Sequence, residues 1–588
     1  MNFTTLSRRA RFGLATLSGI LLGLAFPPTG LAGGLLAFVA IVPLLIALES
    51  ADSLRKTFYT TFVAMFFLGI VSNYWVGGWS SSGEGDKFLM LGGVLLALVH
   101  PFWLVVPFLL YDMVRRRFGR TAALYLLPLF QAGFEYAHSF GDLSYPWLNL
   151  YDTQTYNLSF IQFIEFTGPY ALSMVIVLGN VQIFQLIRSA ATKDRLRYAI
   201  PLLLLIAIPY IYGMTAMSRH EKSAASLRVT VVQPNIDPWA KWNTDDQRIL
   251  DTNFAATRTA LAACHDSTDL IVWPETAITF FITSPAKQDA YRQLNDFLHE
   301  IKHPLLTGFP DREELQAGRD SIPEDAHYTG VGDFYYRSWN AAMLIQPTWD
   351  LPRDHTDVIM SGDYNVPTLR KAVYHKQKLV PLGEHVPFVE IFPALGRVFQ
   401  WGVGLGSWNV GKGYEPLSMN LADAHNQMAQ NPTLRVNPEI CYESVYPSFI
   451  RHFVDHGANL LAVITNDGWY GESSGPYQHE QFAVLRAIEN RRYLVRSANT
   501  GISVIIDDRG RFVKQLPLFR SGSITERVPL IERRTLYTRF GDFVAIPSML
   551  FSILMFVYSL ATWFIARSRR KPAASMQSPE AHSDALPL

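Results

Sequence analysis

Cysteine and charged residues are both scarce in this chain. Its 588 residues include two cysteines, Cys264 and Cys441, which are too few for a disulfide framework or a cysteine-rich metal cluster. Charged residues make up 17% of the chain and hydrophobic residues 49%, a balance too apolar for an ordinary soluble protein. The formal net charge is +1 and the basic residues form no stripe with interleaved aromatics, so we expect no nucleic-acid partner. The composition indicates a membrane protein.

Long apolar runs are concentrated before residue 220 and again near the C-terminus. Each run is about long enough to cross a hydrocarbon core of ~30 Å as a helix. The runs occupy residues 11–26, 31–49, 57–78, 88–112, 121–138, 165–188, 199–216 and 543–566. This pattern predicts an all-α bundle of eight transmembrane helices, seven within residues 1–220 and the eighth within residues 541–568.

Lysine and arginine are distributed unevenly among the segments between these runs. They cluster before the first run, in every second loop and after the last run, at Arg8, Arg9, Arg11, Arg55, Lys56, Arg115, Arg116, Arg117, Arg120, Arg188, Lys193, Arg195, Arg197, Arg567, Arg569, Arg570 and Lys571. Because such clusters mark cytoplasmic loops, we expect both termini in the cytoplasm. The long segment between the seventh and eighth helices should face the other side, and residues 569–588 should form a disordered cytoplasmic tail.

Residues 221–540 have a different pattern, in which short apolar strands alternate with polar or helical stretches. Strands are expected at residues 227–232, 270–273, 304–309, 341–346, 435–440, 459–465 and 501–506. This alternation favours layered α/β packing. Two polar stretches, 311–337 and 347–370, are expected to be surface insertions.

Three reactive side chains stand at the ends of predicted strands or in adjoining turns: Glu275, Lys376 and Cys441. Strand ends form one rim of an α/β layer, so the three can converge. A carboxylate can take the proton of a thiol as the thiol attacks. An ammonium and the backbone N–H of Tyr442 can then stabilise the negative oxygen of a tetrahedral intermediate. We expect no metal and no other cofactor, because the histidines show no ligand spacing.

The sequences around these residues resemble those of a known family. Glu275 stands in Trp-Pro-Glu-Thr-Ala, Lys376 in Tyr-His-Lys-Gln-Lys-Leu-Val-Pro-Leu-Gly-Glu and Cys441 in Ile-Cys-Tyr-Glu, similar to the Glu-Lys-Cys triad of the nitrilase superfamily. With the flanking apolar runs, residues 10–565 resemble the apolipoprotein N-acyltransferases. Further similar motifs are Tyr-Pro-Trp-Leu at 145–148, Val-Gln-Pro-Asn at 232–235, Thr-Asn-Asp-Gly-Trp-Tyr-Gly at 465–471 and Gly-Pro-Tyr-Gln-His at 475–479.

The resemblance implies a fold and roles for single residues. It implies a nitrilase-like αββα sandwich at residues 221–540, inserted between the seventh and eighth helices of the bundle. Glu384 would orient Lys376, and Glu443 would shape the loop beside Cys441. Lys378 is a rival for the lysine role, but the family spacing to the following Leu-Val-Pro favours Lys376.

The resemblance also implies a reaction. Cys441 would take an acyl chain from a phospholipid, the sn-1 chain of phosphatidylethanolamine, as a thioester. The chain would then pass to the N-terminal amine of a diacylglyceryl-cysteine apolipoprotein. The expected setting is a bacterial inner membrane with a periplasmic catalytic domain, and a monomer is expected. Aromatic residues that would contact the membrane or shield acyl chains are Trp239, Trp242, Phe388, Phe392, Trp401 and Trp408.

Two other functions are open at this point. A membrane-anchored amidase of the nitrilase type would use the same three residues but would pass the acyl group to water. A non-catalytic chain would act as the partner of a polyprenol-phosphate glycosyltransferase. Such a chain would be expected to have lost at least one of Glu275, Lys376 and Cys441, and all three are present.

Overall fold

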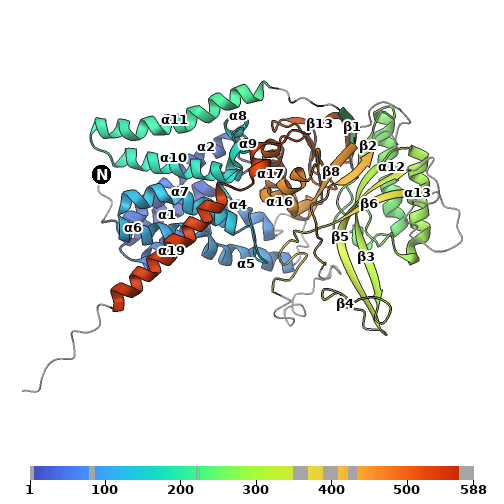
Figure 1. The fold of residues 1–588 in the computed structure, drawn as a ribbon, viewed down its shortest axis with the longest axis horizontal. Coiled ribbons are helices and arrows are strands. Elements are labelled where there is room, and N and C mark those ends of the chain that lie inside the picture. The colour runs from blue at the N-terminus through green and yellow to red at the C-terminus, as the bar shows by residue number, and fades with distance from the viewer. Residues whose placement is uncertain are drawn as a thin grey trace, which may run out of the picture.

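A group of apolar helices and a unit of two β-sheets make up the structure. This computed structural model describes residues 5–77, 87–219, 221, 223, 225–347, 369–388, 408–420 and 433–568. The apolar helices lie together on one side of the molecule and the sheets on the other (Figure 1). In sequence, the sheets lie between two long helices, α11 (Thr192–Met217) and α19 (Ala545–Ser568).

The other main helices of the apolar group follow the runs seen in the sequence. They are α1 (Arg8–Gly23), α2 (Gly30–Ala40), α3 (Val42–Glu49), α4 (Leu54–Asn73), α5 (Lys87–Leu104), α6 (Val106–Phe118), α7 (Arg120–Ala137) and α10 (Tyr170–Arg188). Six segments among the described residues are long and apolar enough to cross a membrane: Gly30–Glu49, Leu54–Gly77, Met90–Phe118, Tyr170–Arg188, Thr192–Met217 and Ala545–Ile565. The runs at 11–26 and 121–138 form α1 and α7, which pack against α4 and α10 but are not among the six. The count of eight spans stays a prediction.

Within the apolar run at 165–188, the long helix begins later than the run itself. Gly168 ends the short helix α9 (Ile164–Thr167) with a φ of 72°, and Pro169 follows, so α10 begins at Tyr170. Between α7 and α9 the chain forms two further short helices, η2 (Leu150–Gln154) and α8 (Leu158–Ile161). This stretch of short helices reaches the sheet unit.

Two mixed sheets form the α/β unit. The first has seven strands, in the order β13-β1-β2-β3-β5-β4 with β6 also paired to β5. Its strands are β1 (Ala225–Gln233), β2 (Leu270–Val272), β3 (Leu305–Gln316), β4 (His327–Tyr328), β5 (Phe334–Pro347), β6 (Leu369–His375) and β13 (Gly522–Leu530). The second has the order β12-β11-β10-β9-β8-β7. Its strands are β7 (Leu417–Asn420), β8 (Thr433–Ile440), β9 (Leu460–Thr465), β10 (Leu494–Ala498), β11 (Ser503–Ile506) and β12 (Phe512–Leu516).

The two sheets pack against each other, and helices cover their outer faces. Ser497 of β10 donates a hydrogen bond to the carbonyl oxygen of Val232 in β1, across the two sheets (3.1 Å). Helices α12 (Asp246–Ala263) and α13 (Gln288–Ile301) cover the seven-stranded sheet, while α16 (Pro447–Asp455) and α17 (Ser474–Asn490) cover the other. All six residues of β9 are buried, as expected for a strand covered on both faces.

The predicted strands are confirmed, with changes in length and number. Each of the seven predicted ranges contains an observed strand, but β3 and β5 extend well beyond theirs because residues 305–316 pair with residues 334–345 in a long antiparallel hairpin. Apart from Leu315, residues 311–337 are exposed or half-buried, as expected for a surface insertion, and both ends of this stretch belong to the hairpin. Residues 348–368, most of the second predicted insertion, lie outside the described residues, as does the predicted tail at 569–588.

Helix α17 joins the α/β unit to the apolar helices. Every residue of α17 except Tyr477 is buried. The side-chain oxygen of Gln478 accepts hydrogen bonds from the indole N–H groups of Trp75 (3.1 Å) and Trp147 (2.7 Å), and its nitrogen donates to the carbonyl of Ser72 (3.0 Å). The motifs at 145–148 and 475–479 therefore meet in this contact.

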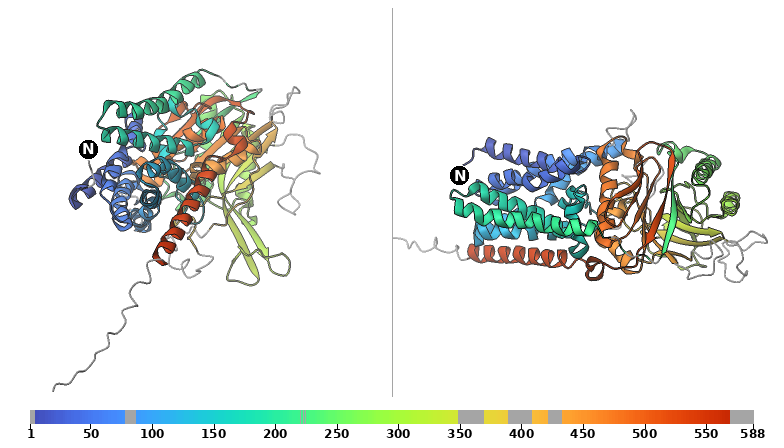
Figure 2. Two further views of the ribbon diagram at one scale, coloured as in Figure 1. Left: turned by 60° about the vertical axis from the view of Figure 1, so that its left-hand side comes forward. Right: turned by 90° about the horizontal axis from the view of Figure 1, so that it is seen from above.

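The bundle extends away from the sheets in one direction. The right-hand view of Figure 2 shows the long helices running side by side with the sheets stacked at one end. The start of α1 and the end of α19 both lie at the end of the bundle farthest from the sheets.

Candidate active site

A cavity of about 430 Å³ lies where the α/β unit meets the apolar helices. Glu275, Lys376 and Cys441 all line it. The same cavity is lined by α5, through Leu91, Gly92, Leu95, Leu96, Val99, His100 and Trp103. A carboxylate, an ammonium and a thiol thus share one space with the apolar side chains of a candidate membrane span.

The backbone brings the three residues together at strand ends. Glu275 lies three residues after the end of β2, Lys376 directly follows β6, and Cys441 directly follows β8. Cys441 also begins the 3₁₀ turn η6 (Cys441–Val445) with a φ of 51°, a left-handed conformation that is rare outside glycine. The sharp change from strand to turn at Cys441 places its side chain at the rim, where the cavity is.

Lys376 lies between two carboxylates. Its Nζ is 2.8 Å from Glu384 Oε1 and 3.4 Å from Glu275 Oε1, and its side chain is buried. Burial alone would lower the pKa of the Lys376 ammonium, but the charges of Glu384 and Glu275 outweigh it and hold the pKa above its usual range. Lys376 therefore stays charged. The rival Lys378 lies over the ring of Tyr446 instead, with its Nζ 5.1 Å from the ring centre.

The Cys441 thiol is protonated at neutral pH. Burial raises its pKa well above the usual range, and the nearby charge of Glu275 raises it further, more than the Lys376 ammonium offsets. A neutral thiol is a weak nucleophile, so it needs a base that removes its proton as it attacks. The carboxylate of Glu275 is close enough for its charge to raise the pKa of the Cys441 thiol, and the two side chains line the same cavity.

Asn340 belongs to this group, although no motif in the sequence distinguishes it. It lies on β5, and its side-chain N–H donates to Glu275 Oε1 (2.8 Å) and to Glu384 Oε1 (3.0 Å). Behind the Glu275 turn, a Cβ at Gly308 would come within 2.7 Å of the Cα of Glu275, so only glycine fits there. The position of the carboxylate is thus fixed from two sides.

Glu443 connects the turn that carries Cys441 to the segment that carries Lys376. Its Oε2 accepts from the backbone N–H of Ile440 (2.9 Å), and its Oε1 accepts from the hydroxyl of Tyr374 (2.6 Å) and the N–H of Gln377 (2.7 Å). Burial raises the pKa of Glu443 to about 7 in spite of these donors. Neutralising it would loosen the two segments from each other.

Tyr442 points toward the apolar helices. Its hydroxyl donates to the carbonyl of Ser144 (3.1 Å), and its ring stacks against Trp147 with the ring centres 6.2 Å apart. Its backbone N–H is among the first of the 3₁₀ turn, where N–H groups have no partner within the helix. The predicted oxyanion role of this N–H stays a prediction.

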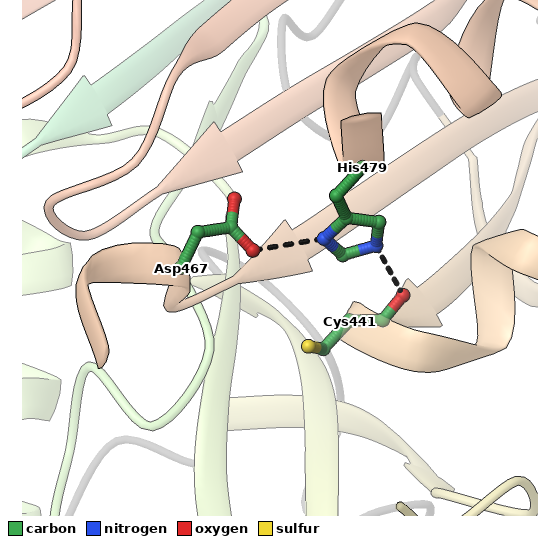
Figure 3. A group of neighbouring side chains, drawn as sticks. All are labelled: Cys441, Asp467 and His479. Carbon is green, nitrogen blue, oxygen red and sulfur yellow. Dashed lines mark hydrogen bonds and ion pairs between the residues drawn. The ribbon is translucent and has the colours of Figure 1, made fainter. Parts of the chain in front are cut away.

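A buried network lies beside Cys441, and its members Asp467 and His479 also line the cavity. His479 Nδ1 is 2.8 Å from Asp467 Oδ1, and His479 Nε2 is 3.0 Å from the carbonyl oxygen of Cys441. In Figure 3 this carbonyl oxygen faces the ring, while the Cys441 sulfur points away from it. The Arg496 guanidinium pairs with Asp467 Oδ2 at 2.5 Å. The network holds the backbone of the strained turn.

Possible metal-ligand atoms of Cys441, Asp467 and His479 lie within 4.8 Å of one another. Both ring nitrogens of His479 already face protein partners, and Asp467 is paired with the fixed charge of Arg496. The charges of Arg496 and His479 hold the pKa of Asp467 well below its usual range even though burial opposes them. A divalent cation would have to displace these contacts beside an arginine, so the residues fit a structural network better than a metal site.

Lys241 is a second residue that sequence reasoning missed. It is buried between Trp239 and Trp242 in the chain, and its Nζ donates to the backbone oxygen (3.0 Å) and the hydroxyl (2.7 Å) of Thr276, the residue after Glu275. Thr276 adopts a φ of 45°, so this turn is strained. Burial lowers the pKa of Lys241 to about 8, partly offset by Glu275. In the sequence, its position between two tryptophans was the one feature that could have indicated a buried lysine.

We expect Lys241→Met to lower kcat about tenfold with a smaller effect on KM, because the loss of two hydrogen bonds frees the Glu275 turn without removing a reacting group. Steady-state kinetics and thermal unfolding of the purified variant would measure this. Lys378→Met is the matched control, since Lys378 contacts aromatic rings and not the Glu275 turn. Equal kcat values for the two variants would contradict the role of Lys241.

The aromatic residues predicted to contact the membrane or shield acyl chains occupy different places. Trp239, Trp242 and Trp408 line the cavity, and Trp408 is 9% exposed. Trp239 packs edge-on against Trp469 with ring centres 4.8 Å apart. Phe388 is exposed and its backbone N–H donates to Asp142 in the loop after α7 (3.0 Å). Phe392 and Trp401 lie outside the described residues.

Comparison with known proteins identifies both halves of the chain. A family described as "Carbon-nitrogen hydrolase" matches residues 228–536, and a second, described as "Apolipoprotein N-acyltransferase N-terminal domain", matches residues 18–182. A crystal structure of an amidase from Nesterenkonia sp. is 18% identical and covers 55% of this chain and 99% of that chain, with a TM-score of 0.33.

Two bacterial relatives align with nearly the full chain. The apolipoprotein N-acyltransferase of Chlorobaculum tepidum is 32% identical over 91% of this chain and 93% of its own length. The apolipoprotein N-acyltransferase of Geobacter metallireducens is also 32% identical, over 92% of this chain and 94% of its own length. With a catalytic unit of the carbon-nitrogen hydrolase type beside a matching helical domain, this chain belongs to the apolipoprotein N-acyltransferase family.

Proposed function

We propose that this protein is a membrane-embedded acyltransferase that acylates the N-terminal amine of bacterial apolipoproteins. The observation that carries the proposal is the cavity in which Glu275, Lys376 and Cys441 meet the apolar side chains of α5. An amidase that acts on small soluble amides would need no cavity wall built by a candidate membrane span. A lipid donor and a lipidated acceptor are both held in the bilayer, and a cavity of this composition can receive their acyl chains.

In the first step, Cys441 attacks the ester carbonyl carbon of a phospholipid while Glu275 takes the thiol proton. The negative oxygen of the tetrahedral intermediate is stabilised by the Lys376 ammonium and the Tyr442 N–H. The C–O bond then breaks, and Glu275 returns the proton to the departing lysophospholipid oxygen. The products are a thioester on Cys441 and a lysophospholipid. The donor proposed from the family resemblance is the sn-1 chain of phosphatidylethanolamine.

In the second step, the free amine of the apolipoprotein diacylglyceryl-cysteine attacks the thioester carbonyl. Glu275 accepts a proton from the amine, the C–S bond breaks, and Glu275 passes that proton to the departing thiolate, which restores the Cys441 thiol. Glu384 and Asn340 keep Glu275 and Lys376 in place through both steps, since they contact both groups or their partners. The chain that is transferred becomes an amide on the lipoprotein.

The proposed orientation places both termini in the cytoplasm and the α/β unit, residues 221–540, in the periplasm of an inner membrane. Two loops rich in basic residues meet at the end of the bundle: Arg120 and Arg188 both lie beside Glu49, at 2.8 Å and 3.8 Å. The ends of α1 and α19 lie far from the sheets (Figure 2). The positive-inside rule then assigns that end to the cytoplasm. The proposed assembly is a monomer with eight spans.

The function can be tested with purified protein in liposomes of phosphatidylethanolamine and a synthetic diacylated lipopeptide. We expect mass spectrometry to find a third acyl chain on the lipopeptide amine and an equal amount of lysophospholipid. Release of free fatty acid with an unmodified lipopeptide would indicate a hydrolase instead. A lipopeptide that carries a blocked amine is the control and should stay unmodified.

A further inference from the structure

A second cavity, of about 260 Å³, lies beside the catalytic one. Residues of α4, of α5 and of the turn directly after α4 line it, and most of them are apolar, such as Met65, Ile70, Val94 and Leu96. Two of the lining residues, Leu96 and His100, also line the catalytic cavity. Two largely apolar spaces therefore share a wall on α5.

Buried polar atoms at this wall have no partner within the described structure. His100 is 5% exposed and Asn73 is 7% exposed. The Nε2 atom of His100 and both side-chain amide atoms of Asn73 form no hydrogen bond with any described residue. A buried polar atom without a partner destabilises the folded protein, and native proteins keep few of them. Atoms of this kind beside an apolar space indicate that a ligand supplies their partners.

A third unpaired group extends this patch toward the nucleophile. Tyr145 lines the catalytic cavity, and its buried hydroxyl has no hydrogen-bond partner among the residues described. Its ring centre is 5.3 Å from that of His100 and 6.5 Å from that of Tyr442, the residue after Cys441. The polar patch therefore lies between the second cavity and the turn of the nucleophile.

We propose that His100, Asn73 and Tyr145 bind the ester carbonyl groups of a diacylglyceryl moiety, whose two acyl chains enter the two cavities. A lipid with two chains has its esters where the chains join, and the polar patch lies where the cavities join. All three side chains can donate hydrogen bonds while uncharged, and an ester carbonyl oxygen accepts them. This inference rests on the proposed function, because it assumes that lipids with two chains enter.

A phosphate group fits the patch less well than an ester. Among the described residues that line the two cavities, Lys376 is the only lysine or arginine, and it is already held by Glu275 and Glu384. An anion moved into an apolar space without a cation pays a large desolvation cost. Uncharged donors instead match an uncharged acceptor.

Two substrates of the proposed reaction carry a diacylglyceryl moiety, and the experiment separates them. In the donor arm, thioester formation on Cys441 is measured with a diacyl phosphatidylethanolamine and with its analogue in which the second chain is ether-linked. In the acceptor arm, transfer is measured with a diacylated lipopeptide and with its dialkyl ether analogue. We expect the wild-type protein to prefer the ester about tenfold in one arm, because the ether lacks the carbonyl acceptor.

His100→Phe and Asn73→Leu should reduce this preference to about one. Both substitutions remove unpaired buried polar atoms, so the unfolding temperature should not fall and a misfolded variant would be recognised. Leu96→Met is the matched control, since it changes the same wall without removing a polar atom and should keep the preference. The inference is wrong if the wild-type protein prefers neither ester, as it would if the patch bound only water, or if His100→Phe keeps the preference. Absence of all acyl transfer by the wild-type protein would instead refute the proposed function.

Discussion

A Cys441→Ala variant incubated with phospholipid should form no acyl adduct, and its transfer activity should fall by at least ~10⁴-fold. The reason is that the thiol is the only group in the cavity, among the described residues, placed to form a thioester beside both Glu275 and Lys376. The wild-type protein should show a mass increase equal to one acyl chain, which neutral hydroxylamine removes. Intact-protein mass spectrometry before and after hydroxylamine measures both results.

The second cysteine supplies the control for this experiment. Cys264 lies just beyond the end of α12, where its thiol donates to the carbonyl of Leu261 (3.4 Å), and it does not line the cavity. Cys264→Ser should therefore keep the adduct and nearly all of the activity. An adduct that persists in Cys441→Ala and disappears in Cys264→Ser would reverse the assignment.

Glu275→Gln should lower the rate of thioester formation by about 10²–10⁴-fold, because an amide cannot accept the thiol proton. The substitution preserves shape, and the amide oxygen can still accept from Asn340. It also removes a negative charge that raises the pKa of the Cys441 thiol. The thiol pKa should therefore fall, so that iodoacetamide alkylates Cys441 faster at neutral pH while catalysis slows. Single-turnover kinetics and the pH dependence of alkylation measure these opposite changes in a Cys264→Ser background.

Asn340→Asp would be a poor control here, since it adds a charge beside Glu384. Glu384→Gln is better, because it lies on the far side of Lys376 and should reduce activity less than Glu275→Gln does. A Glu275→Gln protein with wild-type turnover would show that another group takes the thiol proton. A reduced rate with an unchanged alkylation profile would show that Glu275 acts on the substrate and not on the thiol.

Two of the strands that carry the site, β2 and β8, could be predicted, because a reactive residue stands just beyond the end of each one. Glu275 and Cys441 follow β2 and β8, whose interiors read as continuous buried strands. The motif around Lys376 identified its position even though β6, which precedes it, was not predicted. Among the described strands, β6 pairs only with β5, and its register depends on that neighbour and not on its own pattern.

Asn340 and Lys241 could not be predicted in the same way. Asn340 precedes an apolar strand and reads as an ordinary strand-end residue until β5 is placed beside the Glu275 turn. Lys241 reads as a solvated charge in a polar stretch, yet its ammonium is buried against Thr276. The roles of both depend on contacts between segments distant in sequence, which composition and spacing do not encode. The same holds for the polar patch formed by His100, Asn73 and Tyr145.

The Gln478 amide shows why the α/β unit is not a detachable enzyme. Its hydrogen-bond partners are the indole N–H groups of Trp75 and Trp147, the carbonyl of Pro27, and the carbonyl and hydroxyl of Ser72, all contributed by the helical half of the chain. The next residue, His479, contacts the carbonyl of Cys441. Cutting the chain into a water-soluble fragment would remove all of these partners and expose the Gln478 amide to water, one residue from the contact that supports the Cys441 turn. The apolar helices thus also help to hold the helix that supports the Cys441 turn.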